Sequence, residues 1–228
     1  MPAYNEEASL RSTIETLKAQ PYDYVIVNDG STDRTAQIAK EMGAVLINLP
    51  FNQGLAGAFL AGIQYAAVHN YTCAVQFDAD GQHLPEYIAP MLEAMEREGF
   101  DIVVGSRFLD SAMPCSLRMI GSMMIRTMMK LTTGQTLTDP TSGMRMYNRR
   151  LINLFASRTD LTPEPDTLAY LLRNDVHIGE VPVKMQERQA GVSYLSSFSA
   201  VSYMIRMVFS IMMIQFVREE IYIKEMVQ

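Results

Sequence analysis

The first two-thirds of the chain alternate short apolar runs with amphipathic helical patterns. Four runs have the length and the apolar or β-branched character of strands: residues 24–28, 44–48, 73–77 and 102–105. Nearly continuous apolar runs are typical of strands covered on both faces, and intervening helices are typical of parallel strands. The alternation therefore predicts an α/β fold in which helices flank a mostly parallel sheet.

Capping residues predict where the first two helices begin. Asn5 can cap the first helix, and Glu6 and Glu7 would then complement the partial positive charge of its opening turn. Thr32 or Asp33 can open the second helix in the same way.

Three further helical patterns cover residues 55–69, 116–133 and 196–225. The chain is 48% hydrophobic and 19% charged, which is slightly apolar for a soluble enzyme. Arg206 and Gln215 interrupt the last apolar run, and a bilayer span needs about 20 mostly apolar residues. The sequence therefore predicts apolar helical surfaces without a membrane span.

Composition and missing motifs disfavour several classes of protein. The net charge of −6 argues against a nucleic-acid partner, which needs a basic surface. Cys73 and Cys115 have no CxxC spacing, so neither a disulfide framework nor a zinc site is expected. The first seven residues lack the basic region and apolar core of a signal peptide. The GxGxxG and GxxxxGK[ST] motifs of dinucleotide-binding enzymes and P-loop NTPases are also absent from the sequence.

The sharpest chemical signal is the segment FDADGQH at residues 77–83, directly after a predicted strand. In extended backbone, residues two apart point to the same side, so Asp78 and Asp80 can converge on one cation. Gly81 permits a tight turn, and Gln82 can add a neutral oxygen ligand. These oxygens suit Mg²⁺ or Mn²⁺, whose coordination shell is usually shared with substrate phosphates. The alternative is an exposed turn, because aspartate and glycine are ordinary turn residues.

A second polar segment, VNDGSTD at residues 27–33, again joins a strand to a helix. Ligands of open α/β sheets bind beyond the carboxyl ends of the strands, where Asp29 could accept hydrogen bonds from a base or ribose. A routine turn and helix cap is the alternative, and it suits Asp33 better than Asp29. Two acidic segments at successive strand ends favour a nucleotide and metal site over coincidence.

Several segments, taken in order, resemble family 2 glycosyltransferases of the GT-A fold, which has a Rossmann-like, mostly parallel sheet: residues 2–6, 29–33, 52–58, 78–82 and 105–107. Two later segments resemble the branch that includes dolichol- and undecaprenyl-phosphate sugar synthases: TDPTSGMR at residues 138–145 and RQAGVS at residues 188–193. The resemblance covers residues 2–194. It implies a glycosyltransferase domain over residues 1–194, followed by a C-terminal amphipathic helical segment over residues 195–228.

The family's functional positions can be carried over residue by residue. The resemblance implies that a nucleotide sugar is bound by Pro2, Tyr4, Glu6, Val27, Asp29, Asp78 and Ala79. It implies metal binding by Asp80, Gln82 and Asp78, and contacts with donor or acceptor phosphates by Arg107, Arg188 and Ser193. Asp139 would lie near the reacting sugar, with Asp78 as the other catalytic residue. An Asp-Pro turn is the structural alternative for Asp139.

The implied reaction is a metal-dependent, inverting transfer of a sugar from a nucleotide sugar to undecaprenyl or another polyprenyl phosphate, for cell-wall or surface polysaccharide assembly. In dolichol-phosphate mannose synthases a lysine commonly follows the RxxGxS segment, whereas this chain has Tyr194. UDP-glucose or UDP-N-acetylglucosamine is therefore preferred as donor over GDP-mannose. Open alternatives are a mannosyltransferase that uses GDP-mannose, a family 2 transferase with a saccharide acceptor, a sugar-1-phosphate nucleotidyltransferase and a non-catalytic membrane adaptor.

The family usually has an apolar strand before the segment at residues 2–6, whereas only Met1 precedes that segment here. The first strand of the sheet is therefore expected to be absent. Loss of a central strand would weaken folding and activity.

Two helical patterns predict a membrane-facing surface. Over residues 116–133 a polar, basic stripe recurs every four residues: Arg118, Ser122, Arg126 and Lys130. Such a helix suits an anionic membrane surface, and the alternative is a core helix with a solvated basic stripe. The last helix carries a broad apolar surface that suits a membrane or another subunit. We expect a peripheral enzyme on the cytoplasmic side of the cell membrane, and a small membrane protein or a second copy of the chain is a further candidate partner.

Overall fold

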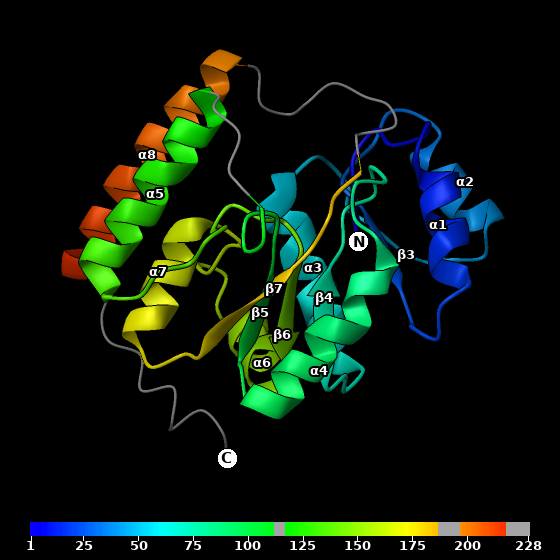
Figure 1. Cartoon of the computed structure of the whole chain (residues 1–228). Coiled ribbons are helices and arrows are strands. Elements are labelled where there is room, and N and C mark those ends of the chain that lie inside the picture. Colours follow the sequence, from blue (N-terminus) through cyan, green and yellow to red (C-terminus); the bar gives the residue numbers. More distant parts are fainter. Residues whose placement is uncertain (112–116, 187–196, 218–228) are drawn as a thin grey trace.

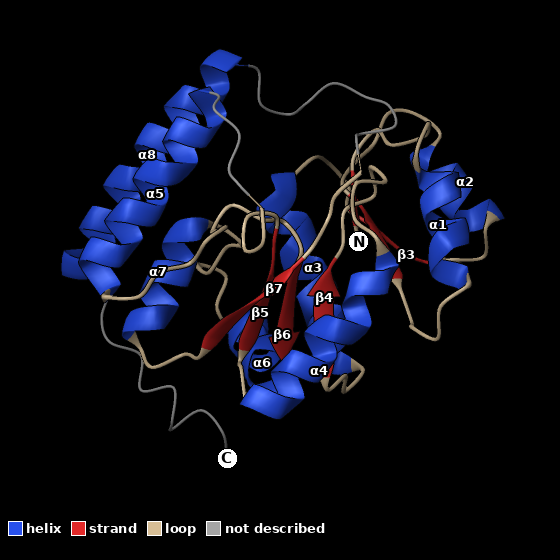
Figure 2. Ribbon diagram, in the orientation of Figure 1, coloured by secondary structure: helices blue, strands red, loops and turns tan. Residues whose placement is uncertain are grey.

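The computed structural model describes residues 1–111, 117–186 and 197–217 of the chain. The strands of the described part are short: β1 (Pro2–Ala3), β2 (Val25–Asn28), β3 (Val45–Asn48), β4 (Cys73–Gln76), β5 (Ile102–Ser106), β6 (Arg145–Asn148) and β7 (Ile178–Pro182). Its helices alternate with these strands: α1 (Leu10–Lys18), α2 (Thr35–Glu41), α3 (Gly54–Val68), η1 (Pro85–Tyr87), α4 (Ile88–Glu98), α5 (Leu117–Thr133), α6 (Arg149–Ser157), α7 (Pro165–Arg173) and α8 (Ser197–Val217). The predicted α/β fold is confirmed (Figure 2).

The strands form two sheets. In the first, β1, β2 and β3 lie in that order and are parallel. The second has the order β4-β6-β5-β7, in which β7 is parallel to β5 while β6 is antiparallel to both neighbours. The mostly parallel arrangement was predicted, but the division into two sheets and the antiparallel β6 were not. Arg145, the first residue of β6, pairs with Val104 near the end of β5, so β6 runs back along β5.

Two strands differ from the prediction. The first strand was expected to be absent, and a short β1 is formed by two residues of the segment at residues 2–6, in which Pro2 pairs with Val27 and Ala3 with Asn28. The run that forms β3 was expected to be covered on both faces. It lies at the edge of its sheet, and Val45 is exposed there.

The predicted cap of the first helix was also wrong. α1 begins at Leu10 after Ser9, and its first turn contains no acidic residue. Asn5 instead has a positive φ of 54°, and its side-chain oxygen accepts a hydrogen bond from the N–H of Thr32, 27 residues away. A long-range contact between loops thus replaces the local cap. α2 begins at Thr35 after Arg34, so neither Thr32 nor Asp33 is its cap residue. Asp33 still accepts a hydrogen bond from the N–H of Thr35, the first residue of the helix, at 2.9 Å.

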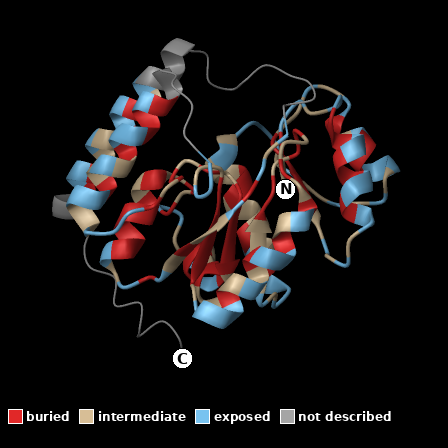
Figure 3. Ribbon diagram, in the orientation of Figure 1, coloured by how far each residue is buried: buried red, intermediate tan, exposed pale blue. Residues whose placement is uncertain are grey.

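Helices cover both faces of the second sheet (Figure 1). Ile102 and Val104 of β5 belong to the core cluster that contains residues of α3, α6 and α7, whereas Val103 belongs to the cluster around α4. Neighbouring residues of a strand point to opposite faces, which explains the division of β5 between two clusters. The buried residues therefore concentrate in and beside this sheet (Figure 3).

α5 and α8 lie side by side at the left of Figure 1 and run in the same direction. A Cβ atom at Gly121 of α5 would lie 2.9 Å from the Cβ of Met204 in α8, so the two helices approach closely at this glycine. Two hydroxyl groups of α8 bind carboxylates at the start of α7: Tyr203 donates to Glu164, and Ser210 donates to Asp166. Burial and the neighbouring Glu164 carboxylate raise the pKa of Tyr203.

The outer side of the α5–α8 pair is apolar. Exposed side chains on α5 are Ile120, Met123, Met124 and Leu131, and those on α8 are Ile205, Phe209, Met212 and Met213. We call these eight residues the outer apolar face. Ser122 is buried and does not belong to an exposed polar stripe, contrary to the prediction. Within the described residues, no helix is long and apolar enough to cross a membrane.

Gly121→Ala is expected to destabilise the protein. The added methyl group would meet the Cβ of Met204, and overpacking of this kind costs about 1–3 kcal/mol. Part of that cost is offset by the better helix propensity of alanine, which is worth about 1 kcal/mol. Thermal unfolding followed by circular dichroism should show a melting temperature a few degrees below that of the wild type, since 1 kcal/mol corresponds to about 2–4 °C at this chain length.

Gly62→Ala in α3 is the matched control, because its added methyl would make only an ordinary 3.6 Å contact with Val27. This control should melt at or above the wild-type temperature. Equal melting of the two variants would contradict the close approach of α5 and α8.

Candidate active site

The loops after β1 and β2 are joined by hydrogen bonds. The N–H of Asn5 donates to the hydroxyl of Ser31 at 3.0 Å, and the N–H of Glu7 donates to a carboxylate oxygen of Asp33 at 3.0 Å. Burial opposes ionisation of Asp33, but hydrogen bonds from Thr35 and from the Glu7 backbone hold its pKa below the usual value. Asp33 therefore fixes the two loops together. This agrees with the structural role in a turn that was the alternative for this residue.

Asp29 ties the loop after β2 to the start of α3. Its side chain is buried, and its Oδ1 accepts a hydrogen bond from the N–H of Gln53 at 2.7 Å. The next residue, Gly30, has a φ of +66°, and a Cβ there would come within 2.6 Å of the backbone nitrogen of Asn52. Only glycine permits this close approach. The predicted segments at residues 29–33 and 52–58 are thus brought into direct contact.

The other predicted nucleotide-binding residues differ in how far they are exposed to solvent. Tyr4 is exposed, and Pro2 and Glu6 are half-buried, with Oε2 of Glu6 accepting a hydrogen bond from the Ser9 hydroxyl at 2.7 Å. Val27 and Ala79 are buried in the core, where their side chains support the loops rather than face solvent.

The acidic loop, which we define as residues 78–82, makes a tight turn after β4. Gly81 has the positive φ of 78° that was expected of a turn glycine. Oδ1 of Asp80 accepts a hydrogen bond from the N–H of Gln82 at 3.0 Å, so the Asp80 side chain stabilises the turn. Asp80 is buried, whereas the side chain of Asp78 is 35% exposed.

The acidic loop fits a divalent cation that is shared with a ligand. Within the described residues, no group of three or more His, Cys, Asp or Glu could hold a metal ion. The predicted ligands here are the carboxylates of Asp78 and Asp80 and the amide oxygen of Gln82. Hard cations such as Mg²⁺ bind through few carboxylates when water and phosphate oxygens complete the shell. The donor set therefore suits a cation that arrives with a diphosphate.

Arg107 and Asp139, both predicted site residues, form an ion pair with each other. The Nε of Arg107 donates to Oδ2 of Asp139 at 2.6 Å, and Nη2 donates to Oδ1 at 2.9 Å. The side chain of Asp139 is 0% exposed and that of Arg107 is 31% exposed. The guanidinium group thus binds both carboxylate oxygens and still reaches the surface. In the described part of the chain, its Nη1 has no hydrogen-bond partner.

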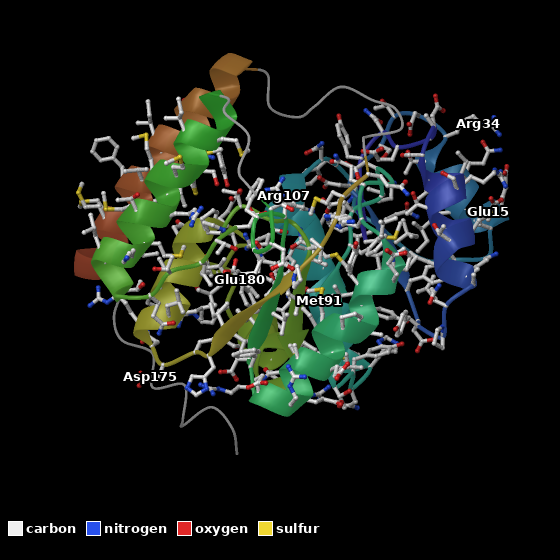
Figure 4. All side chains as sticks on the ribbon, in the orientation of Figure 1. Glu15, Arg34, Met91, Arg107, Asp175 and Glu180 are labelled. Carbon is white, nitrogen blue, oxygen red and sulfur yellow. The ribbon has the colours of Figure 1, made fainter. Side chains whose placement is uncertain are left out.

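Glu180 of β7 holds the loop that carries Asp139. Its Oε1 accepts hydrogen bonds from the backbone N–H groups of Thr138 and Asp139, each at 2.9 Å. Figure 4 shows Arg107 above Glu180, which lies within the sheet. Asp139 is therefore fixed at two points: its carboxylate by the Arg107 guanidinium and its backbone by the Glu180 carboxylate.

The loop at residues 138–143 also contacts the acidic loop. A Cβ at Gly143 would lie 2.9 Å from Oδ2 of Asp78, so backbone and carboxylate touch here. Arg145 is buried and holds the same loop by donating to the carbonyl oxygens of Ser142 at 2.9 Å and Pro140 at 2.8 Å. The structure thus brings Asp78 against the loop that also carries Asp139.

Two predicted phosphate contacts, Arg188 and Ser193, lie outside the described residues, as does Tyr194. Gln186, the last described residue before that segment, donates its N–H to the carbonyl oxygen of Gln82 at 3.0 Å. The acidic loop is therefore hydrogen-bonded to the chain that leads toward Arg188.

Sequence reasoning missed Glu180, Arg145 and His83 as site residues. An acidic residue inside an otherwise apolar strand was a usable signal for Glu180. Arg145 and His83 stood in segments that were already singled out, but no role was assigned to them.

Known proteins resemble this chain over most of its length. A sequence profile described as Glycosyl transferase family 2 matches residues 1–155. The UDP-N-acetylglucosamine–dolichyl-phosphate N-acetylglucosaminyltransferase of Methanococcus voltae is 30% identical over 211 residues, which cover 81% of this chain and 83% of that protein. The undecaprenyl-phosphate mannosyltransferase of Micrococcus luteus is 33% identical over 214 residues, with 86% of each chain covered.

A solved structure shares the fold. Glucosyl-3-phosphoglycerate synthase from Mycobacterium tuberculosis matches with a TM-score of 0.69 at 17% identity, covering 96% of this chain and 78% of that one. The resemblance inferred from the ordered segments is confirmed by the profile and the relatives. The chain belongs to glycosyl transferase family 2 and is a glycosyltransferase with the GT-A fold.

Proposed function

We propose that this glycosyltransferase moves a sugar, with inversion of configuration, from a UDP-sugar to undecaprenyl or another polyprenyl phosphate at the cytoplasmic face of the membrane. The observation that carries the proposal is the contact between Gly143 and Asp78. It brings the acidic loop beside the loop that is bound to Arg107. One site then offers carboxylates for a cation with its diphosphate and a guanidinium for a second phosphate.

The relatives support a lipid phosphate acceptor and a divalent cation. The Methanococcus voltae relative is named for UDP-N-acetylglucosamine and dolichyl phosphate, and the Mycobacterium tuberculosis neighbour was solved with Mn²⁺ and UDP. A mannose donor is the second candidate, because the Micrococcus luteus relative is named for mannosyl transfer to undecaprenyl phosphate.

Different residues of the site would bind the cation and the nucleoside. Asp80 and Gln82, with Asp78, would hold Mg²⁺ or Mn²⁺, which would neutralise the diphosphate as its bond to the anomeric carbon breaks. A polyprenyl phosphate oxygen would form the new bond to that carbon from the opposite face. This oxygen is already anionic near neutral pH, so the site needs no strong general base. Asp29 and the loop at residues 2–6 would bind the nucleoside.

Arg107 would bind a phosphate group of donor or acceptor through the part of its guanidinium that Asp139 leaves free. Asp139 has no exposed side-chain surface, and both its oxygens are occupied by Arg107. Of the roles considered for Asp139, orientation is therefore the one that we propose. It would act through Arg107 and hold the guanidinium in a single position.

Purified protein with Mn²⁺ and UDP-glucose or UDP-N-acetylglucosamine is expected to release UDP only when undecaprenyl phosphate is added. EDTA should abolish the release, because the diphosphate would lose its neutralising cation. Asp80→Asn removes one ligand charge and should lower turnover by about 10²-fold or more. Glu86→Gln, an exposed acid six residues further on, is the matched control and should retain full activity.

Pyrophosphate chemistry would instead indicate a nucleotidyltransferase. Release with a saccharide acceptor alone would contradict the lipid acceptor, and release from GDP-mannose alone would favour the second candidate. Normal turnover by the Asp80→Asn protein would contradict the assignment of the acidic loop.

Arg107→Lys should lower both activity and stability. Lysine keeps the charge but loses the bidentate contact with Asp139. A buried carboxylate that is imperfectly paired lowers the stability of the folded protein. We expect kcat/KM for the polyprenyl phosphate to fall by about 10²-fold and the melting temperature to fall as well. Arg97→Lys, at an exposed ion pair with Glu98, should change neither quantity. Wild-type kcat/KM in the Arg107→Lys protein would rule out a phosphate contact by the guanidinium.

The outer apolar face supports a lipid-associated substrate. Lys130 and Arg206 are exposed on the same two helices, and cations beside apolar side chains suit an anionic bilayer surface. A polyprenyl chain is insoluble in water, so its transferase needs such a surface. We therefore propose that this face rests on the cytoplasmic leaflet, with a second copy of the chain or a small membrane protein as the competing occupants.

Replacing Met123 and Phe209 together by glutamate should reduce sedimentation of the protein with anionic liposomes. Both side chains are more than half exposed, so the substitutions add charge without disturbing the core. Val68→Glu, on the exposed end of α3, is the control and should bind liposomes as the wild type does. Unchanged binding by the double variant, or dissociation of a dimer instead, would contradict a lipid-facing role.

A further inference from the structure

We propose that His83 is a positioning residue that fixes the Asp78 carboxylate for its contact with the cation and the donor. The inference rests on the proposed function, because it concerns the geometry of a metal ligand. His83 is not itself placed to touch substrate, since its side chain is only 2% exposed.

Both nitrogens of the His83 ring face the same residue. Nδ1 accepts a hydrogen bond from the backbone N–H of Asp78 at 2.9 Å, and Nε2 lies 3.6 Å from Oδ2 of the Asp78 carboxylate. An imidazole nitrogen can accept a hydrogen bond only without a proton, so the neutral ring carries its proton on Nε2. Nε2 lies 3.6 Å from the carboxylate, which is beyond hydrogen-bond distance but close enough for electrostatic attraction. The ring therefore binds the backbone of Asp78 and lies beside its side chain.

The ring has little freedom to move. It packs edge-on against Phe77, with ring centroids 5.4 Å apart and an angle of 78° between the planes. On the other side, a Cβ at Gly143 would lie 3.6 Å from Cε1 of His83 and 2.9 Å from Oδ2 of Asp78. Oδ2 is therefore enclosed between an imidazole and a glycine backbone, while 35% of the Asp78 side chain is exposed. With Oδ2 enclosed in this way, Oδ1 would be the oxygen available to a ligand.

Such support matters because a metal ligand acts only from a narrow range of positions. Hydrogen-bond partners behind a metal-binding side chain set its orientation, and their loss typically costs 10–100-fold in metal affinity. Without His83, the Asp78 carboxylate could rotate about its own side-chain bonds, and the exposed oxygen would no longer be fixed.

The test compares three substitutions at His83 by Mn²⁺ binding, measured by electron paramagnetic resonance with UDP present. His83→Phe keeps a ring but removes both nitrogens, and it should weaken Mn²⁺ binding by about 10–100-fold. His83→Asn keeps an acceptor near the position of Nδ1, and His83→Gln keeps an amide near that of Nε2, so each should restore part of the affinity. His177→Asn, at an exposed histidine, should bind Mn²⁺ as the wild type does.

Gly143→Ala probes the same carboxylate from its other side. The added methyl should displace Asp78 and weaken Mn²⁺ binding while His83 stays intact. Wild-type affinity in a folded His83→Phe protein would overturn the inference, and so would equal losses in all three His83 variants.

A second readout does not depend on the metal. Two-bond ¹H–¹⁵N spectra of the neutral His83 ring should show the proton on Nε2, and a proton on Nδ1 would overturn the inference. Failure of the proposed function would look different: wild-type protein would then bind no Mn²⁺ with UDP, while the spectrum would still report the predicted ring.

Discussion

The loop at residues 138–143 depends on a carboxylate that water does not reach. Asp139 has no exposed side-chain surface, and a buried charge without a partner costs about 3–5 kcal/mol. Arg107 supplies the partner, and its planar fork matches the two carboxylate oxygens. Because the pair is formed within the protein, the guanidinium is held in place before a ligand arrives. Glu180 then fixes the backbone on which Asp139 stands.

The fold could be predicted because strands and loops leave local patterns in the sequence. Short apolar runs mark the strands, and the carboxyl ends of parallel strands meet at one edge of a sheet. Polar segments after such strands therefore belong near each other, wherever they lie in the sequence. The sequence alone thus predicted that Asp29 and Asp78 follow strand ends, although the strands that they follow, β2 and β4, belong to different sheets.

The pairing of side chains could not be predicted in the same way. Asp139 binds a residue 32 positions away, and Asn5 binds one 27 positions away, so neither contact leaves a local pattern. The helix faces were misjudged for a related reason. α5 carries apolar residues nearly all round, and the buried side is chosen by α8, which comes much later in the chain. Ser122 lies on that buried side, where its hydroxyl has no hydrogen-bond partner among the described residues.

α3 carries no charged residue, yet it positions the loops on both sheets. α3 packs on β1 and β2 of the first sheet and on β4 of the second, and it begins directly after the residue that binds Asp29. Small residues such as Gly62, which approaches Val27, keep this helix thin where the sheets meet it. α3 is thus a spacer whose thickness sets how closely the first sheet, which carries Asp29, approaches β4, which leads into the acidic loop. A substitution on this buried helix surface would shift the two strand ends relative to each other, while every recognisable sequence motif stays the same.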